Sequence, residues 1–218
     1  MLLVPLYEHP AARPDAWDAL VRNAERIHSV VLNPASGPGR AADEGFAAAA
    51  ARLREAGVAV LGYTDTDYGR RPHGEVVRDL VRYRDWYGAD GAFLDQAAAD
   101  GELLPHYRRL AVAARAAGAR TLVLNHGAHP HPGYAELADV LVTFEGPWDA
   151  YQEAEVPRWT AGHPALRFCH LVYAVPPGTA PDTAAALAAD RHAGVYCAVP
   201  GAGAHPWGTL PYALEAAR

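Results

Sequence analysis

Two acidic residues, Asp95 and Glu145, each end a short apolar run, and this position makes them candidates for catalysis. The preceding runs read AFL at 92–94 and LVTF at 141–144. A pair of carboxyl groups can divide acid–base chemistry, with one protonated as a general acid and the other ionised as nucleophile or base. Glycosidases work with such a pair. Either residue could instead cap a following helix, since acidic residues are favoured there.

Further polar and aromatic residues stand at or just beyond the ends of the apolar runs, where they could contact a substrate. The candidates are Tyr7, Asn33, Tyr63, Asp65, Asp67, Tyr68, Arg70, Gln96, Asn125, His126, His170 and Tyr173. Core packing alone does not explain why run after run stops at a carboxylate, an amide or an aromatic ring. The tyrosines add flat apolar faces of the kind on which sugar rings stack.

Metal binding is the weaker interpretation of the histidine and acid clusters. Three histidines gather at 126–131, but a barrel hydrolase of the amidohydrolase kind needs an HxH pair on its first strand, and this one carries only His9. Asp65 and Asp67 alternate, yet acids in a loop more often make turns or bind substrate. We therefore predict no metal and no cofactor.

The elements that must position these residues form a regular alternation along the chain. Apolar runs predict strands at 2–7, 29–33, 58–63, 91–95, 120–125, 139–145, 167–174 and 194–199. Helical segments are predicted at 14–27, 41–56, 74–87, 103–117, 132–137, 148–160, 179–191 and 207–217. Eight such pairs favour a single (β/α)8 barrel domain over residues 1–218, with catalytic side chains at the C-terminal ends of the strands. An open doubly wound sheet is the alternative, weakened because no GxGxxG follows the first run.

Composition excludes several classes of function. The 218 residues carry a net charge of −6 and half are hydrophobic, so the chain can bury a full core. All 19 basic residues are arginine, which excludes Schiff-base lysine chemistry and the GxxxxGK[ST] phosphate loop. The acidic balance without a basic run argues against nucleic acid or a membrane surface as partner. We expect Cys169 and Cys197, each within an apolar run, to be buried free thiols.

The N-terminal sequence gives an expectation about location. Its apolar start is shorter than a signal peptide requires, and no apolar stretch reaches the roughly 20 residues of a membrane span. The chain as it stands is expected in the cytoplasm, or outside the cell if a leader has been removed.

Several segments have a distinctive content and order. They are PLY at 5–7, VLNPASGPG at 31–39, LGY at 61–63 continuing to TDYGR at 66–70, YRDWY at 83–87 with GAFLD at 91–95, and VTFE at 142–145. In these segments, over nearly its whole length, the chain resembles the spherulin-4 (spherulation-specific family 4) proteins. The resemblance implies a (β/α)8 barrel and endo-acting hydrolysis of α-1,4-linked N-acetylgalactosamine polymers.

The resemblance also implies roles for individual residues. The family's Asp-Glu pair at the end of the fourth strand falls on Asp95 and Gln96, and its sixth-strand glutamate falls on Glu145. Gln96 departs from the family, because an amide can act neither as acid nor as base. The fifth-strand motif, usually Asn-Pro-Gly, reads Asn125-His126-Gly127 here.

Three functions remain open from the sequence. The first is a glycoside hydrolase with Asp95 and Glu145 as the carboxylate pair, retaining if their separation is about 5 Å and inverting if it is larger. The second is an intracellular enzyme of small molecules, an isomerase or lyase, which Gln96 and the altered fifth loop favour. The third is a carbohydrate-binding protein that has lost turnover. The expected partner is a carbohydrate or another small molecule.

Overall fold

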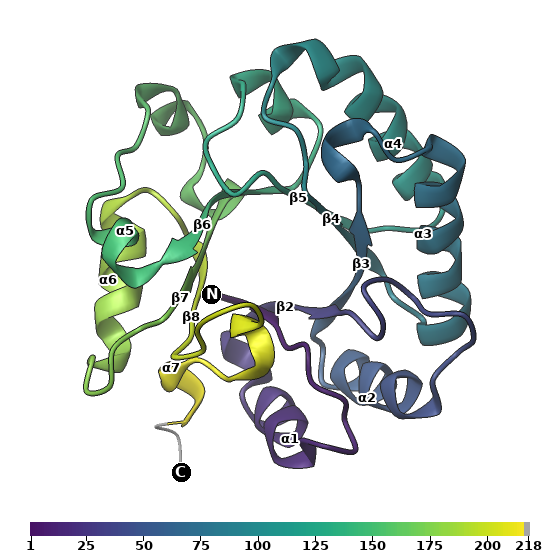
Figure 1. Ribbon diagram of the computed structural model, residues 1–218, viewed down its shortest axis with the longest axis horizontal. Helices are drawn as coiled ribbons and strands as arrows, with labels where there is room; N and C mark the ends of the chain where they lie inside the picture. The colour runs from purple at the N-terminus through teal and green to yellow at the C-terminus, as the bar shows by residue number, and fades with distance from the viewer. Residues whose placement is uncertain (216–218) are drawn as a thin grey trace.

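The computed structural model describes residues 1–215 and shows a closed barrel of eight parallel strands with helices around it (Figure 1). The strands are β1 (Leu2–Pro5), β2 (Ile27–Leu32), β3 (Ala59–Asp65), β4 (Gly91–Asp95), β5 (Thr121–Asn125), β6 (Val140–Pro147), β7 (Phe168–Tyr173) and β8 (Val195–Ala198). Each strand pairs with the next, and β8 closes onto β1 where Tyr196 meets Leu2. The predicted (β/α)8 barrel is confirmed and the open sheet is excluded.

The outer helices are longest on one half of the barrel. They are α1 (Pro14–Arg22), α2 (Glu44–Glu55), α3 (His73–Tyr87), α4 (Leu104–Ala116), α5 (Trp148–Gln152), α6 (Pro181–Asp190) and α7 (Tyr212–Glu215). Among residues 1–215, none of these helices has the length and apolar character needed to cross a membrane.

Several predicted helices are shorter than expected, among them 14–27, which ends at Arg22, and proline interrupts two of them. The segment 132–137 forms a 3₁₀ turn, Pro132–Glu136, and 148–160 divides into α5 and a 3₁₀ turn that follows Pro157. The segment 207–217 contains a turn at Pro206–Gly208 and then α7, which begins after Pro211. Proline lacks the N–H that a helix interior requires. Positions 216–217 of that prediction lie outside the described residues.

Side chains along the strands alternate between the barrel interior and the helices. Phe93 and Val123 belong to the inner core with Cys169, while Leu94 and Leu122 pack among the apolar residues under α4. Both cysteines are buried free thiols, as predicted. Because every strand runs in the same direction, the strand ends that carry the candidate site residues meet at one mouth.

Strand β6 breaks this alternation with a bulge. Val142 pairs with Cys169, but the next paired residue is Phe144, opposite His170, so Thr143 is an extra residue in the strand. A one-residue shift reverses the facing of every later side chain. Val142 faces the interior, and strict alternation from it would turn Glu145 outward; with the bulge, Glu145 faces the mouth.

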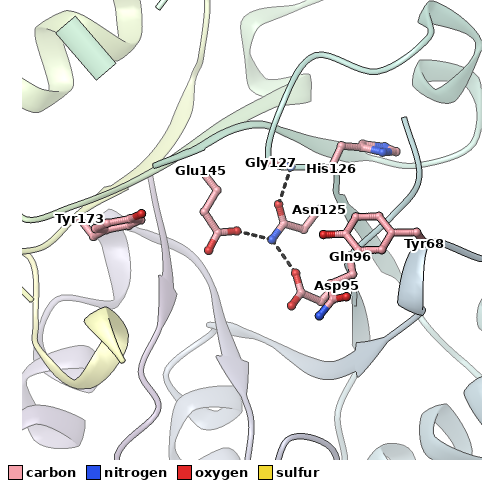
Figure 2. Close-up of a pocket in the computed structure, with 8 residues that line it drawn as sticks. All are labelled: Tyr68, Asp95, Gln96, Asn125, His126, Gly127, Glu145 and Tyr173. Atoms are coloured by element: carbon pink, nitrogen blue, oxygen red, sulfur yellow. Dashed lines mark hydrogen bonds between the residues drawn. The ribbon is translucent and has the colours of Figure 1, made fainter. Parts of the chain in front are cut away.

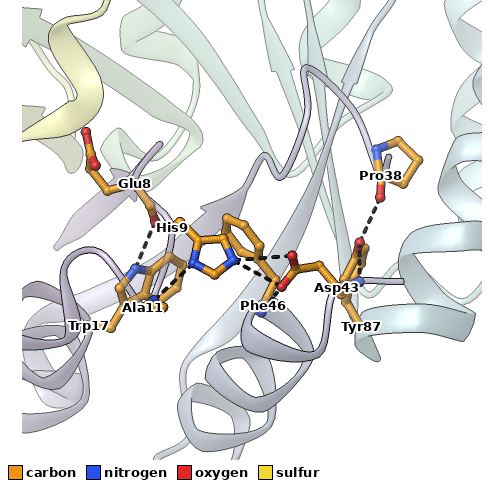
Figure 3. Close-up of polar contacts among 8 residues, drawn as sticks. All are labelled: Glu8, His9, Ala11, Trp17, Pro38, Asp43, Phe46 and Tyr87. Carbon is orange, nitrogen blue, oxygen red and sulfur yellow. Dashed lines mark hydrogen bonds and ion pairs between the residues drawn. The ribbon is translucent and has the colours of Figure 1, made fainter. Parts of the chain in front are cut away.

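The loops after β1 and β2 are joined beside the mouth (Figure 3). His9 Nε2 lies 3.2 Å from the Asp43 carboxylate, and that carboxylate also caps α2 by accepting the N–H of Phe46 at 3.0 Å. The Tyr87 hydroxyl donates to the Pro38 carbonyl at 2.7 Å, which fastens the second loop to α3. These contacts fix the rim on the side of β1 and β2.

Candidate active site

A cavity of about 330 Å³ opens at the C-terminal ends of the strands (Figure 2). Its lining consists of Tyr68, Asp95, Gln96, Asn125, His126, Gly127, Glu145 and Tyr173. Asp95 and Asn125 are the last residues of β4 and β5, and Glu145 follows the bulge of β6. The catalytic candidates therefore lie where barrel enzymes carry their chemistry.

Asn125 holds the two acidic side chains together. Its Nδ2 donates to Asp95 Oδ1 at 2.6 Å and to Glu145 Oε2 at 2.5 Å (Figure 2). Those two carboxylate oxygens can be no farther apart than the sum of the two distances, about 5.1 Å. The N–H of Gly127 donates to Asn125 Oδ1 at 3.1 Å, so the amide oxygen is turned away from the acids. Asn125 thus presents both of its amide hydrogens to carboxylates.

The Asp95 carboxylate accepts more side-chain hydrogen bonds than the Glu145 carboxylate does. The Tyr63 hydroxyl donates to its Oδ2 at 2.7 Å, in addition to the bond from Asn125. Burial and the charge of Asp65 raise the pKa of Asp95, while Tyr63, the Gln96 backbone N–H and Asn125 oppose that rise. Hydrogen bonds of this kind favour the ionised form.

Glu145 receives less support for its charge. Burial raises its pKa and the charge of Asp95 raises it further, whereas Asn125 and the nearby Trp207 indole lower it. The two acids therefore differ in environment, and such differences assign roles in acid–base pairs. The arrangement suits Glu145 as the protonated acid and Asp95 as the anion.

These raised pKa values predict a stability effect. A carboxyl group that binds its proton more tightly when folded costs stability as pH rises above its unfolded pKa of about 4. The Glu145→Gln variant removes one such group, so its Tm should exceed the wild-type Tm at pH 7. The difference should shrink toward pH 4, where the unfolded carboxyl also becomes protonated. Thermal unfolding from pH 3.5 to 7.5 measures it, and a gap that grows toward acid pH would contradict the prediction.

A buried hydroxyl pair supports the end of β4 from behind. The Tyr107 hydroxyl accepts the N–H of Ala98 at 2.9 Å and lies 2.9 Å from Thr66 Oγ1. Thr66 in turn donates to the carbonyls of Asp95 and Gln96 at 2.9 Å each. This chain fixes the backbone that carries Asp95 and holds Gln96 at a left-handed φ of 48°.

Several predicted binding residues lie around the cavity without lining it. Tyr63 orients Asp95, and Tyr7 packs edge-on against Tyr63 with ring centroids 5.9 Å apart. Asn33 uses its side-chain oxygen to accept the N–H of Gly37 at 2.9 Å, which shapes its own loop. Asp65 accepts the N–H of Asp67 at 2.7 Å. None of these side chains lines the cavity: Tyr63 and Tyr7 belong to or pack against the inner core, and Asn33 and Asp65 bond within their own loops.

Asp67 and Arg70 form an exposed ion pair at the rim. The Arg70 guanidinium donates to both carboxylate oxygens of Asp67, at 2.5 and 3.2 Å. Neither side chain lines the cavity, so direct substrate contact by either stays a prediction.

His170 lies away from the candidate site, on the outer face of β7. It lies between Cys169 and Leu171 on β7, both of which belong to the inner core, so alternation turns it toward the helices. There it is buried, with Nδ1 2.9 Å from the Tyr151 hydroxyl. Burial lowers its pKa to about 3, so the ring is neutral. The prediction failed because the sequence does not show which face of β7 points inward.

His126 lines the cavity as a neutral ring. Its Nδ1 donates to the Ala98 carbonyl at 2.9 Å, and burial lowers its pKa to about 4. In the part of the chain that the structure describes, no three His, Cys, Asp or Glu side chains converge as a metal would need. Nor does any arginine line the cavity within residues 1–215. The site therefore presents two acids with no fixed cation, which disfavours anionic ligands.

Two residues of the site were not among the predicted ones. Gly127 contributes the N–H that orients Asn125 and adopts a φ of 66°, a left-handed conformation that favours glycine. Trp207 packs edge-on against Tyr173, with ring centroids 6.2 Å apart. The Asn-x-Gly spacing was a possible signal for Gly127. Trp207 lies beyond the last strand, and its aromatic ring was the only signal for it.

Comparison with known sequences gives two matches. The sequence profile described as spherulation-specific family 4 matches residues 1–214. Spherulin-4 from Physarum polycephalum is 34% identical over 149 residues, which cover 66% of this chain and 44% of that protein. The match thus spans less than half the length of this curated relative.

Solved structures with the same fold include carbohydrate-related proteins. Sph3 of Aspergillus clavatus, determined in complex with GalNAc, superposes with a TM-score of 0.84 at 24% identity, over 98% of this chain and 94% of that chain. The GH113 β-mannanase AaManA of Alicyclobacillus acidocaldarius, in complex with ManMIm, gives a TM-score of 0.50 at 14% identity, over 99% and 89% of the two chains. At these identities the likeness establishes the barrel fold alone.

Proposed function

This chain belongs to spherulation-specific family 4, and on that premise we propose that it is a glycoside hydrolase acting on an α-linked N-acetylgalactosamine-type chain. The observation that carries the proposal is the Asn125 bridge, which keeps two partly buried carboxylates with oxygens within about 5.1 Å at the barrel mouth. The substrate class rests on the family resemblance and on the GalNAc bound to Sph3, a protein of the same fold.

The separation of the acids favours a retaining mechanism, for which carboxyl groups stand about 5–5.5 Å apart. Asp95 attacks the anomeric carbon while Glu145 gives its proton to the glycosidic oxygen, so the leaving sugar departs as an alcohol. A glycosyl ester on Asp95 remains. Glu145, now ionised, takes a proton from water, and the water oxygen attacks the same carbon and releases Asp95.

The charge of the site is compatible with this substrate. The cavity holds two acids and a neutral His126, so a neutral or amino sugar enters without opposing a like charge. The amide of Gln96 and the hydroxyls of Tyr68 and Tyr173 offer hydrogen bonds to hydroxyl and acetamido groups.

Incubation with partly deacetylated α-1,4-galactosaminogalactan tests the proposal. Mass spectrometry should find released oligosaccharides with the wild-type protein and none with Asp95→Asn or Glu145→Gln. Proton NMR of the first products should show the α-anomer, as retention requires. A folded wild-type protein that releases nothing would overturn the assignment for this polymer, and a first product with the β-anomer would overturn the retaining mechanism.

Gln96 favours a second candidate, a carbohydrate-binding protein without turnover. Its amide lines the cavity at the position where the resemblance expects a glutamate, and it cannot exchange a proton. The Gln96→Glu variant separates the two functions. Polymer release by Gln96→Glu but not by wild type, with binding by both, would favour the second candidate. Release by wild type would favour the first.

A further inference from the structure

Tyr68 occupies a backbone conformation that a tyrosine rarely adopts. Its φ and ψ are 52° and 36°, in the left-handed region, and the preceding Asp67 has a φ of 46°. Asparagine or glycine accepts this region more readily than a bulky residue does. The side chain is 49% exposed, so burial does little to offset the strain. Strained backbone of this kind gathers at binding and active sites, so it points to a function.

The surrounding loop holds Tyr68 in this conformation. Its N–H donates to the Gln96 carbonyl at 2.8 Å, and the N–H of Gly69 donates to the Thr66 carbonyl at 2.9 Å. Arg71 donates to the Asp65 carbonyl at 2.9 Å and forms an ion pair with the buried Asp79 at 2.5 Å. The loop is thereby bonded both to the end of β4 and to α3. These contacts fix the backbone position from which the Tyr68 side chain extends.

Tyr68 lines the cavity, and the Arg70 guanidinium lies over its ring. The Arg70 guanidinium carbon lies 5.6 Å from the ring centroid, and Asp67 holds that guanidinium in place. Figure 2 shows the ring beside Gln96, on the side of the carboxylate pair opposite to Tyr173. A ligand can therefore stack on the face that Arg70 leaves open.

We propose that Tyr68 is an aromatic platform for a sugar ring bound next to the carboxylate pair, on the side opposite to Tyr173. The apolar C–H face of a pyranose stacks on the open face of the tyrosine, while Arg70 and the strained loop fix the ring before binding. A platform that is already ordered loses less entropy when the ligand binds. This inference rests on the proposed carbohydrate function and adds a specificity residue to it.

The Tyr68→Asn variant is the sharpest test, because asparagine fits the left-handed backbone but lacks the ring. In the Glu145→Gln background, where hydrolysis does not interfere, calorimetry measures binding of an α-1,4-linked N-acetylgalactosamine tetrasaccharide. We expect Tyr68→Asn to bind about tenfold more weakly or worse, with a Tm equal to or above that of its parent. Tyr68→Phe should recover most of the lost binding. Val112→Ala, an exposed apolar position on α4, is the matched control.

The outcomes separate the platform from the hydrolase. Unchanged binding by Tyr68→Asn, or no binding of the tetrasaccharide by the parent, would overturn the platform. If wild type cleaves the polymer and Tyr68→Asn cleaves it equally well, the platform falls and the hydrolase stands. If binding depends on the ring of Tyr68 but wild type cleaves nothing, the platform stands and the hydrolase falls. A purely structural role of Tyr68 would lower the Tm together with binding.

Discussion

The Glu145→Gln variant should lose about 10³-fold in kcat on the polysaccharide, since a positioned acid–base group contributes about 10²–10⁴-fold. The loss is expected because an alkoxide leaving group needs the proton that Glu145 holds under its raised pKa. In a dinitrophenyl α-glycoside the leaving group is dinitrophenolate, which departs without that proton, so the first step should be almost unaffected on this substrate. Stopped-flow release of dinitrophenol should then show a burst, followed by slow hydrolysis of the glycosyl ester.

Azide provides the control for this role. The anion attacks the glycosyl ester without a base, so it should restore turnover of the dinitrophenyl substrate by Glu145→Gln. Two displacements at the anomeric carbon give an α-glycosyl azide. Equal loss on the polysaccharide and on the dinitrophenyl substrate, without azide rescue, would show that Glu145 is not the acid.

The Asp95→Asn variant should lose about 10⁴-fold or more in kcat, on activated and natural substrates alike. An amide cannot form the glycosyl ester, and a better leaving group does not replace the nucleophile. The Tyr63 hydroxyl and Asn125 Nδ2 donate to different oxygens of Asp95, at 2.7 and 2.6 Å. The asparagine oxygen can accept from Asn125, and its NH2 group can donate to the Tyr63 hydroxyl instead. The fold around the site should therefore persist, and the Tm should confirm it.

The configuration of the azide product distinguishes the two acids. With Asp95→Asn, azide would attack the substrate directly and give a β-glycosyl azide in a single displacement. The same anion therefore produces opposite anomers from the two variants, which NMR resolves. An α-azide from Asp95→Asn, or near-wild-type activity in that variant, would contradict its role as nucleophile.

Much of the fold and part of the candidate site could be predicted from the sequence. Apolar runs of strand length alternating with helical segments predicted the barrel, because that pattern buries both faces of a parallel sheet. The motifs at 31–39 and 61–70 carried the family resemblance, which the match over residues 1–214 confirms. Asp95, Asn125 and Glu145 could be grouped because the C-terminal ends of parallel strands share one mouth.

Other features depended on the tertiary structure. The inward facing of Glu145 requires the bulge at Thr143, since strict alternation from Val142 would place it outside the barrel. The direction in which each β7 side chain points also excludes His170 from the site, because its ring points toward α5. Asn33 and Asp65 accept hydrogen bonds from their own loops, a local choice that residue type does not reveal.

The sequence by itself therefore determined which strand ends carry acids and amides, because hydrophobic periodicity is a local property of the chain. Only the tertiary structure decided that Asn125 bridges Asp95 and Glu145 with oxygens within about 5.1 Å, and that Tyr68 borders them from a strained loop. Separation, facing and pKa depend on barrel closure, register and burial. These quantities arise between segments distant in sequence, so no local pattern encodes them.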